Sequence, residues 1–179
     1  SEATIYGRFG FGVAGMCATY ELAGGSRLRP GARPVTHTVR LLEPHEVRAA
    51  IPALHEEVAT GHIGAVGRPA HWWDNSLGEF DDPGRSLTRW VAVSVDEHGR
   101  TDGYVDVALD DHRPSPGVAR VRRLVIGDLF AGSDGAYRAL WRHVLEVDLV
   151  ASVIAPRRPV DERLRWLLED PRAMRTVQV

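Results

Sequence analysis

The chain has 179 residues, 44% of them apolar and 26% charged, a composition typical of a folded globular protein with a sizeable core. Its 22 basic and 24 acidic residues give a formal net charge of −2, so no basic excess indicates nucleic acid or an anionic membrane as a partner. Every basic residue is an arginine, and the lack of lysine excludes enzymes that depend on a Schiff-base or phosphate-loop lysine.

The first 34 residues are expected to form the end of one domain and a linker. Three glycines interrupt residues 7–12, and the apolar run from Val13 to Leu22 predicts a strand. The stretch from Gly24 to Pro34 is rich in Gly, Pro and Arg, as linkers often are. We therefore expect a domain boundary in this linker, with residues 35–179 forming a second domain.

Residues 35–179 carry alternating helix and strand patterns. Apolar residues spaced by 4, 3 and 4 positions predict an amphipathic helix after Pro44, and Ser133 is a suitable N-cap for a later helix. Two alternating runs around the polar turn DEHGRT predict an antiparallel hairpin. The expected helices are 45–60, 69–80, 134–149 and 161–168, and the expected strands are 39–44, 90–95, 103–109, 118–126, 151–155 and a last one from 176.

This order of elements predicts an α/β protein with a mixed sheet. The antiparallel part of that sheet is of the α+β type. The order of elements resembles that of the GNAT acetyltransferase fold, in which an antiparallel meander precedes a helix and a splayed strand. The single cysteine, Cys17, and the lack of an apolar run of ~18 residues or of a leader indicate a cytoplasmic protein with no membrane partner. Both ends look cut, because the chain starts at Ser1 without Met and ends in the strand-like Val177-Gln178-Val179.

Tyr6 lies in the pattern Y-x-x-x-G-F, which resembles the second signature of GNAT acetyltransferases. When an amine attacks acetyl-CoA, the departing thiolate must be protonated, and a positioned phenol can donate that proton. The alternative is that Tyr6 is an ordinary amphipathic aromatic at a helix end, with its hydroxyl in water. The short pattern alone leaves both interpretations open.

The longer string SEATIYGRFGFG resembles the enhanced intracellular survival (Eis) acetyltransferases of actinobacteria, which acetylate several amines of aminoglycosides and of lysine. The resemblance continues through VRLLEPHEV, RPAHWWDNSL, ALWRHVLEVDLV and RPVDERLRWLLEDPRAMRT, and so covers nearly the whole chain. It implies an acetyl-CoA-dependent N-acetyltransferase with a small-molecule amine substrate. It also implies a homo-oligomer, a hexamer in this family, whereas the exclusion of a nucleic-acid partner rests on the charge balance alone.

Residue by residue, the resemblance makes Tyr6 the general acid that protonates the coenzyme A thiolate. Ser1 and Glu2 fall where the family contacts acetyl-CoA, at the end of the strand whose splay admits it. Trp73 matches an aromatic of the second domain that lines the substrate pocket. The competing interpretation of Trp73 is that it packs in the core with Trp72 and Leu77, because aromatic residues at helical spacing commonly do so.

Two parts of the family's machinery have no counterpart in this sequence. Its arginine-rich phosphate loop has no match before Tyr6, and its general base, a C-terminal carboxylate on a third domain, is not Val179. The equivalent loop of the second domain would be residues 126–133, where Asp128 stands and the Arg/Gly spacing is missing. We therefore expect the end of a catalytic GNAT domain followed by a second, degenerate one that does not bind coenzyme A.

The remaining polar clusters predict little chemistry. His55-Glu56-Glu57 lacks the second histidine of a zinc-protease helix, and the eight histidines are scattered, so we expect no metal. Asp106 and Asp110-Asp111-His112 are interpreted as a solvated acidic cluster at a strand end. Two functions remain: an N-acetyltransferase, or a non-catalytic GNAT-like scaffold that supports the first domain and oligomer contacts.

Overall fold

The computed structural model describes residues 3–31, 36–78, 88–112 and 121–179. Its helices are α1 (Ala3–Gly7), α2 (Pro44–Ala59), α3 (Ala70–Gly78), α4 (Asp134–Leu145) and α5 (Leu164–Leu167), with a 3-10 turn at Pro171–Ala173. Its strands are β1 (Ala18–Ala23), β2 (Thr38–Leu41), β3 (Thr88–Val95), β4 (Thr101–His112), β5 (Val121–Ala131), β6 (Ser152–Arg158) and β7 (Met174–Gln178).

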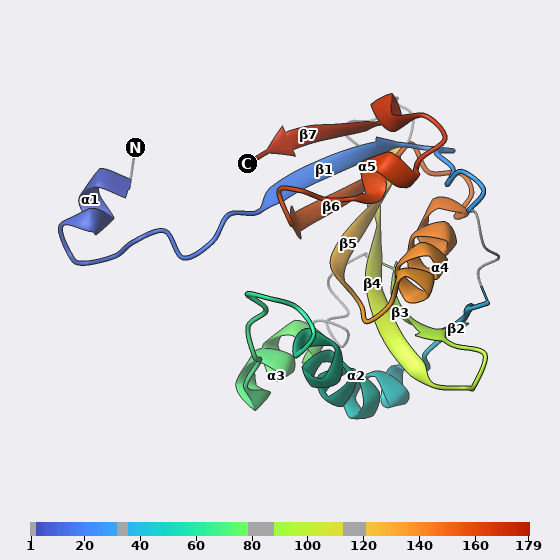
Figure 1. Ribbon diagram of the computed structural model, residues 1–179, viewed down its shortest axis with the longest axis horizontal. Helices are drawn as coiled ribbons and strands as arrows, with labels where there is room; N and C mark the ends of the chain where they lie inside the picture. Colours follow the sequence, from blue (N-terminus) through green and yellow to red (C-terminus); the bar gives the residue numbers. More distant parts are fainter. Residues whose placement is uncertain (1–2, 32–35, 79–87, 113–120) are drawn as a thin grey trace.

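The strands form one mixed sheet of seven, in the order β2-β3-β4-β5-β6-β1-β7. All neighbouring pairs are antiparallel except β5 and β6, which run parallel. Helices α2 and α3 cover one face of this sheet and α4 covers the other (Figure 1). The expected α/β class and mixed sheet are therefore confirmed.

Side chains of the central strands alternate between two core clusters, one on each face. Val91 and Val93 pack with α2 and α3, whereas Ala92, which lies between them on β3, packs with α4. The α4 cluster is the larger and contains Leu140 and Trp141, which are fully buried. The sheet thus separates two apolar layers, one under α4 and one under α2 and α3.

Helix starts follow the signals in the sequence. Pro44 occupies the first turn of α2, and the backbone N–H of Glu43 donates to Glu46 Oε2 at 2.8 Å. Ser133 caps α4, accepting a hydrogen bond of 3.1 Å from the N–H of Ala136. These caps explain why both helices begin where the sequence predicts.

Several expected elements differ in extent, among them the strand expected from Val13, which begins at Ala18. The segment 126–131, expected as a loop, continues β5 to Ala131, because it pairs with β4 across a bulge at Asp106. The last expected helix shrinks to the four residues of α5. The expected helix to residue 149 ends at Leu145, and Leu149 adopts a left-handed φ of 62°.

Strand β1 lies inside the sheet, between β6 and β7. Leu22 is fully buried there, and the hydroxyl of Tyr20 donates to the carbonyl of Val160 at 2.8 Å. Ahead of β1, α1 and the following extended segment lead away from the sheet (Figure 1). The break in packing therefore comes before Ala18, earlier than the linker Gly24 to Pro34 where the sequence places the boundary.

Candidate functional site

A groove of about 1760 Å³ lies along β4 and β5. Its walls come from residues 14–17, the loop between α2 and α3, helix α3, and the segment after β6. Five arginines and five carboxylates line it: Arg68, Arg89, Arg157, Arg158 and Arg163, with Asp106, Asp128, Asp134, Asp161 and Glu162. Because the formal charges balance, the pairing between individual side chains decides the chemistry of each part.

A hydrogen-bonded chain of four side chains, here called the His55–Arg68 network, lies at one end of the groove. The hydroxyl of Tyr104 donates to Asp128 Oδ2 at 2.8 Å, and Arg68 Nη1 donates to the same oxygen. Since the only hydroxyl proton of Tyr104 goes to Asp128, His55 Nδ1 is assigned as the donor to Tyr104 Oη, at 2.9 Å. The network links the buried His55 on α2 to a cation at the groove surface, on the face of the sheet that α2 and α3 cover.

The surroundings of this network fix its protonation. Burial, followed by the charge of Asp128, raises the pKa of Tyr104 above its ordinary value. Burial, followed by the charge of Arg68, lowers the pKa of His55. Burial acts to lower the pKa of Arg68, but its bond to Asp128 more than offsets this and the pKa is raised. The network thus holds a neutral histidine, a neutral tyrosine and one ion pair.

Three aromatic rings surround the guanidinium of Arg68. Its Cζ lies 5.1 Å from the ring centroid of Trp73, 5.5 Å from Phe130 and 5.9 Å from Trp72. His55 packs edge-on against Trp73 and Phe130, with centroids 5.2 and 4.6 Å apart. These distances are those of cation–π contacts, so the rings and the cation stabilise one another.

Trp73 lies both in the core and at the groove wall. It is 7% exposed and belongs to the core cluster that contains Leu77, yet its remaining surface lines the groove. Its neighbour Trp72 is 51% exposed and lines the same groove. The structure thus places Trp73 in the wall of a cleft, and its contact with substrate stays a prediction.

A second ion pair ties α3 to the sheet. Arg89 binds both carboxylate oxygens of Asp106, with Nε 2.8 Å from Oδ1, and its Nη1 donates to the carbonyl of Ser76 at 3.0 Å. A Cβ at Gly127 would lie 2.7 Å from Asp106 Oδ2, so only glycine leaves room for this carboxylate. The expectation of a solvated cluster is wrong for Asp106, because it lies within β4 and is paired.

Two arginines cross the gap where β5 and β6 separate. The parallel pairing described for these strands covers 123–125 with 152–154. Beyond it, Arg157 Nη2 donates to the carbonyl of Gly127 at 3.1 Å, and Arg158 Nη1 donates to that of Leu129 at 2.8 Å. Arg157 has a left-handed φ of 54°. The guanidinium groups therefore satisfy β5 carbonyls that a neighbouring strand would otherwise satisfy.

Glu162 holds one of these arginines in place. Its Oε2 lies 2.7 Å from Arg158 Nε, and its Oε1 accepts from the hydroxyl of Tyr137 on α4. Arg163 Cζ lies 4.1 Å from the ring centroid of Tyr137. Burial, followed by the charge of Glu162, raises the pKa of Tyr137, so its hydroxyl remains a donor. The gap is thus closed by a connected set of side chains from β6, α4 and the segment before α5.

The amino end of α4 is occupied by the protein's own side chains. Ser133 Oγ donates to Asp102 Oδ2 at 2.6 Å, and His37 Nε2 lies 3.0 Å from the same oxygen. A Cβ on Gly135 would collide with the ring of His37, so this ring rests on the first turn of the helix. Asp134 binds Arg163. Carboxylates at this helix end disfavour a bound phosphate, which would need free N–H groups there.

Tyr6 lies apart from the groove. It is 52% exposed on α1, with its ring edge-on to Phe11 at 6.0 Å, and its hydroxyl bonds to no residue that the structure describes. Ser1 and Glu2 lie outside the described residues. The described residues therefore do not bring Tyr6 and Trp73 into one site.

The other candidates show no reactive arrangement. Cys17 is exposed at the groove mouth, and His55 is buried in the core rather than free to bind metal. Over the described ranges, no group of three or more His, Cys, Asp or Glu side chains could hold a metal ion. Among the helices of those ranges, none is long and apolar enough to cross a membrane.

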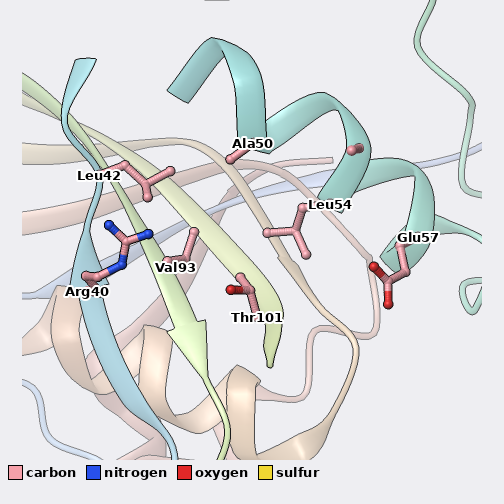
Figure 2. Close-up of a pocket in the computed structure, with 8 residues that line it drawn as sticks. Arg40, Leu42, Ala50, Leu54, Glu57, Val93 and Thr101 are labelled. Atoms are coloured by element: carbon pink, nitrogen blue, oxygen red, sulfur yellow. The ribbon is translucent and has the colours of Figure 1, made fainter. Parts of the chain in front are cut away.

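A smaller pocket of about 200 Å³ lies between α2 and the edge of the sheet. Figure 2 shows Leu42, Leu54 and Val93 forming its apolar floor, with Arg40 and Glu57 at its rim. Arg40 Nη1 donates a hydrogen bond of 3.0 Å to Glu46 Oε1. Because its charged rim is partly paired and its floor is apolar, it offers no catalytic constellation.

Sequence reasoning missed the His55–Arg68 network. Arg68, Tyr104 and Asp128 lie 36 and 24 positions apart on a loop and two strands, so no local spacing connects them. The one available signal is Asp128, an acidic residue in the apolar run that forms β5. A carboxylate within such a strand indicates a buried partner.

A family model described as acetyltransferase (GNAT) domain matches residues 64–179. An uncharacterised N-acetyltransferase of Streptomyces griseus is 29% identical over 99% of the chain and 44% of its own length. The N-acetyltransferase Eis of Mycobacterium tuberculosis is 31% identical over 98% of the chain and 42% of its own length.

Among solved structures, Eis1 from Mycobacterium abscessus superposes with a TM-score of 0.77 at 35% identity, over 99% of this chain and 42% of that one. The chain thus spans less than half the length of these relatives. The family match covers more than half of the chain and agrees with the mixed sheet and the parallel β5–β6 pair. The chain belongs to the GNAT acetyltransferase family.

Proposed function

We propose that this chain is part of an N-acetyltransferase that moves an acetyl group from acetyl-CoA, its co-substrate, to a primary amine of the aminoglycoside or lysine type. The observation that carries the proposal is the 31% identity to the N-acetyltransferase Eis over 98% of the chain, which includes the Tyr6 motif. We further propose that the segment ahead of β1, which carries Tyr6, belongs with a first, catalytic domain, and that the protein is a cytoplasmic homo-oligomer.

In the proposed reaction Tyr6 is the general acid. The amine nitrogen attacks the acetyl carbon, the carbon–sulfur bond breaks, and the thiolate takes the hydroxyl proton of Tyr6 while a base takes the surplus proton of the amine. The exposure of Tyr6 on α1 leaves its hydroxyl accessible to a thiolate and fits the alternative of an ordinary amphipathic aromatic equally well, so the support for this role comes from the motif. Ser1 and Glu2 are the proposed contacts to acetyl-CoA, and Trp73 is a proposed wall of the amine pocket.

Replacing the hydroxyl of Tyr6 tests this function. In the intact gene product, Tyr6→Phe should lower kcat by ~10²-fold or more, because the thiolate then leaves without its proton donor. Tyr6→Phe keeps the ring contact with Phe11, so circular dichroism and the melting temperature should match those of the wild type. An unchanged kcat for acetyl transfer to a primary amine would rule out Tyr6 as the acid.

A second function is favoured for the unit that β1 forms together with residues 35–179: a GNAT-like scaffold that supports catalysis without binding acetyl-CoA. Its carrying observation is the amino end of α4, where Ser133, Asp102 and His37 fill the place of a pyrophosphate. The residues described there do not fit coenzyme A. No catalytic step is therefore assigned to this unit.

A further inference from the structure

The guanidinium of Arg68 sits in a cage that is built like a binding site for an external cation. We propose that Trp72, Trp73, Phe130 and Asp128 form a cation-binding cage, that Arg68 fills it in this structure, and that the ammonium or guanidinium group of a substrate binds there when Arg68 moves out. The identification of the occupant as an amine substrate rests on the proposed function. The cage itself rests on the geometry below.

The cage has the two components that cation recognition requires. Three ring centroids, of Trp73, Phe130 and Trp72, lie 5.1, 5.5 and 5.9 Å from the guanidinium carbon of Arg68, all within the ~6 Å range of a cation–π contact. Asp128 supplies one carboxylate, which pairs with the same guanidinium. The side chain of Arg68 is 21% exposed, so the cage opens on the groove.

Two walls of the cage, Asp128 and Phe130, are fixed independently of Arg68. Asp128 accepts a second hydrogen bond, from Tyr104 at 2.8 Å, and His55 supports Tyr104 from behind. Phe130 stacks on Tyr104 with an interplanar angle of 14°. Because these contacts belong to the core, the carboxylate and the ring stay in place when the arginine leaves.

The residue that fills the cage is carried by residues 60–69, a segment between α2 and α3 that pairs with no strand. Its described backbone N–H groups bond locally, as from Gly61 to Val58 and from Ala65 to His62. Its contacts with the core are made by the carbonyl of Val66, 3.5 Å from His55 Nε2, and by the ring of His62, which packs edge-on against Phe130. Ile63 and Val66 are exposed, and the loop contains three glycines. Arg68 can therefore withdraw without breaking a strand ladder.

Exchange of one cation for another also avoids a large electrostatic cost. Removing Arg68 alone would leave the carboxylate of Asp128, 19% exposed, without its charge partner. An incoming ammonium or guanidinium restores that pair and the cation–π contacts in the same place. The cage therefore selects for cationic ligands and against neutral ligands of similar size.

Binding of n-propylguanidinium to the 179-residue chain tests the cage directly. By calorimetric titration, Arg68→Ala should bind this probe ~10-fold or more tightly than the wild type, because the cage is then vacant. Arg68→Lys refills the cage with an ammonium group and should bind like the wild type. The double variant Arg68→Ala/Asp128→Asn should lose this increase in affinity, because the carboxylate that pairs with the probe is then gone.

A second measurement needs no loss of Arg68 and so does not depend on the folding of a variant. In the wild type, saturating probe should shift the indole N–H resonances of Trp72 and Trp73, assigned by Trp→Phe variants, and leave that of Trp166 unchanged. Three outcomes would each overturn the cage. One is equal affinity of the wild type and a folded Arg68→Ala for the probe, and another is tighter binding that persists when Asp128→Asn is added. The third is the absence of selective shifts of the Trp72 and Trp73 indole resonances. Since no acetyl transfer is measured, failure of Tyr6 as the acid leaves these results unaffected.

Discussion

His55 is a buried histidine whose neighbours keep it uncharged. It is 1% exposed, donates to Tyr104, and lies between the rings of Trp73 and Phe130. Burial is the main cause of its lowered pKa, and the positive charge of Arg68 adds to it. The carbonyl of Val66, followed by Asp128 and Glu56, acts to raise this pKa but does not compensate.

This environment predicts a loss of stability in mild acid. The unfolded chain binds a proton at His55 near the ordinary pKa of 6.5, whereas the folded chain binds it only at lower pH. The contribution of His55 is therefore fully present above pH 6.5 and is lost as the pH falls from there to the folded pKa. For one histidine, the free energy of unfolding falls by at most about 1.4 kcal/mol per pH unit.

Urea unfolding between pH 5 and pH 8 measures this effect. The free energy of unfolding should fall below pH 6.5 in the wild type and fall less steeply in His55→Leu, whose apolar side chain suits the same cluster. His143 provides a parallel case, because burial lowers its pKa as well. A slope that is identical in wild type and His55→Leu would contradict the assignment of a neutral, buried His55.

Some residues of interest can be identified from a local sequence motif, and others cannot. Trp73 stands in a contiguous motif, and the sequence singled it out together with Tyr6, which the structure places outside the groove. The partners Arg68, Tyr104 and Asp128 meet only through the pairing of β4 with β5 and the path of the α2–α3 loop. Asp128 was expected in a loop, and its role became visible only once β5 was seen to extend to Ala131.

The same distinction applies to the helices and strands, because local sequence signals predict some of them and distant pairing determines others. Helices α2 and α4 and the β3–β4 hairpin were predicted, because caps, helical spacing and a short turn lie within each segment. The position of β1 was not, because Ala18 pairs with Arg158, 140 positions away. Nothing in the sequence near Ala18 specifies a partner so distant.

The insertion of β1 predicts that two truncations behave differently. Removing residues 1–16 takes away α1 and the exposed Phe9 and Phe11, and should change the melting temperature by only a few degrees, the effect of about 1 kcal/mol or less. Removing residues 1–24 also deletes Tyr20 and Leu22 from the core. Each buried side chain is worth ~2–5 kcal/mol against a total of ~5–15 kcal/mol, so this chain should not fold.

Circular dichroism melts of both truncated chains distinguish these outcomes. Cooperative melting of residues 25–179 at the temperature of residues 17–179 would show that β1 contributes little. It would also favour the boundary in the Gly24 to Pro34 linker that the sequence suggests. The shorter deletion serves as the matched control for loss of the chain's first residues.

At the scale of the whole molecule, two separate features oppose cofactor binding by the described GNAT-like unit. The gap between β5 and β6 is crossed by Arg157 and Arg158, which take the carbonyls of Gly127 and Leu129. At the start of α4, Ser133 and its partners occupy the helix end. A cofactor would have to displace both sets of contacts to lie across this sheet.

Calorimetric titration of acetyl-CoA into the 179-residue chain should therefore give no binding heat up to millimolar concentrations. The pyrophosphate would meet the carboxylates of Asp102 and Asp134 where it needs free N–H groups, and each β5 carbonyl taken by an arginine would have to be released. The intact gene product, titrated under the same conditions, serves as the positive control. A sub-millimolar Kd for the 179-residue chain would mean that these side chains rearrange when acetyl-CoA binds. The unit would then be a second acetyl-CoA site, and the scaffold proposal would be wrong.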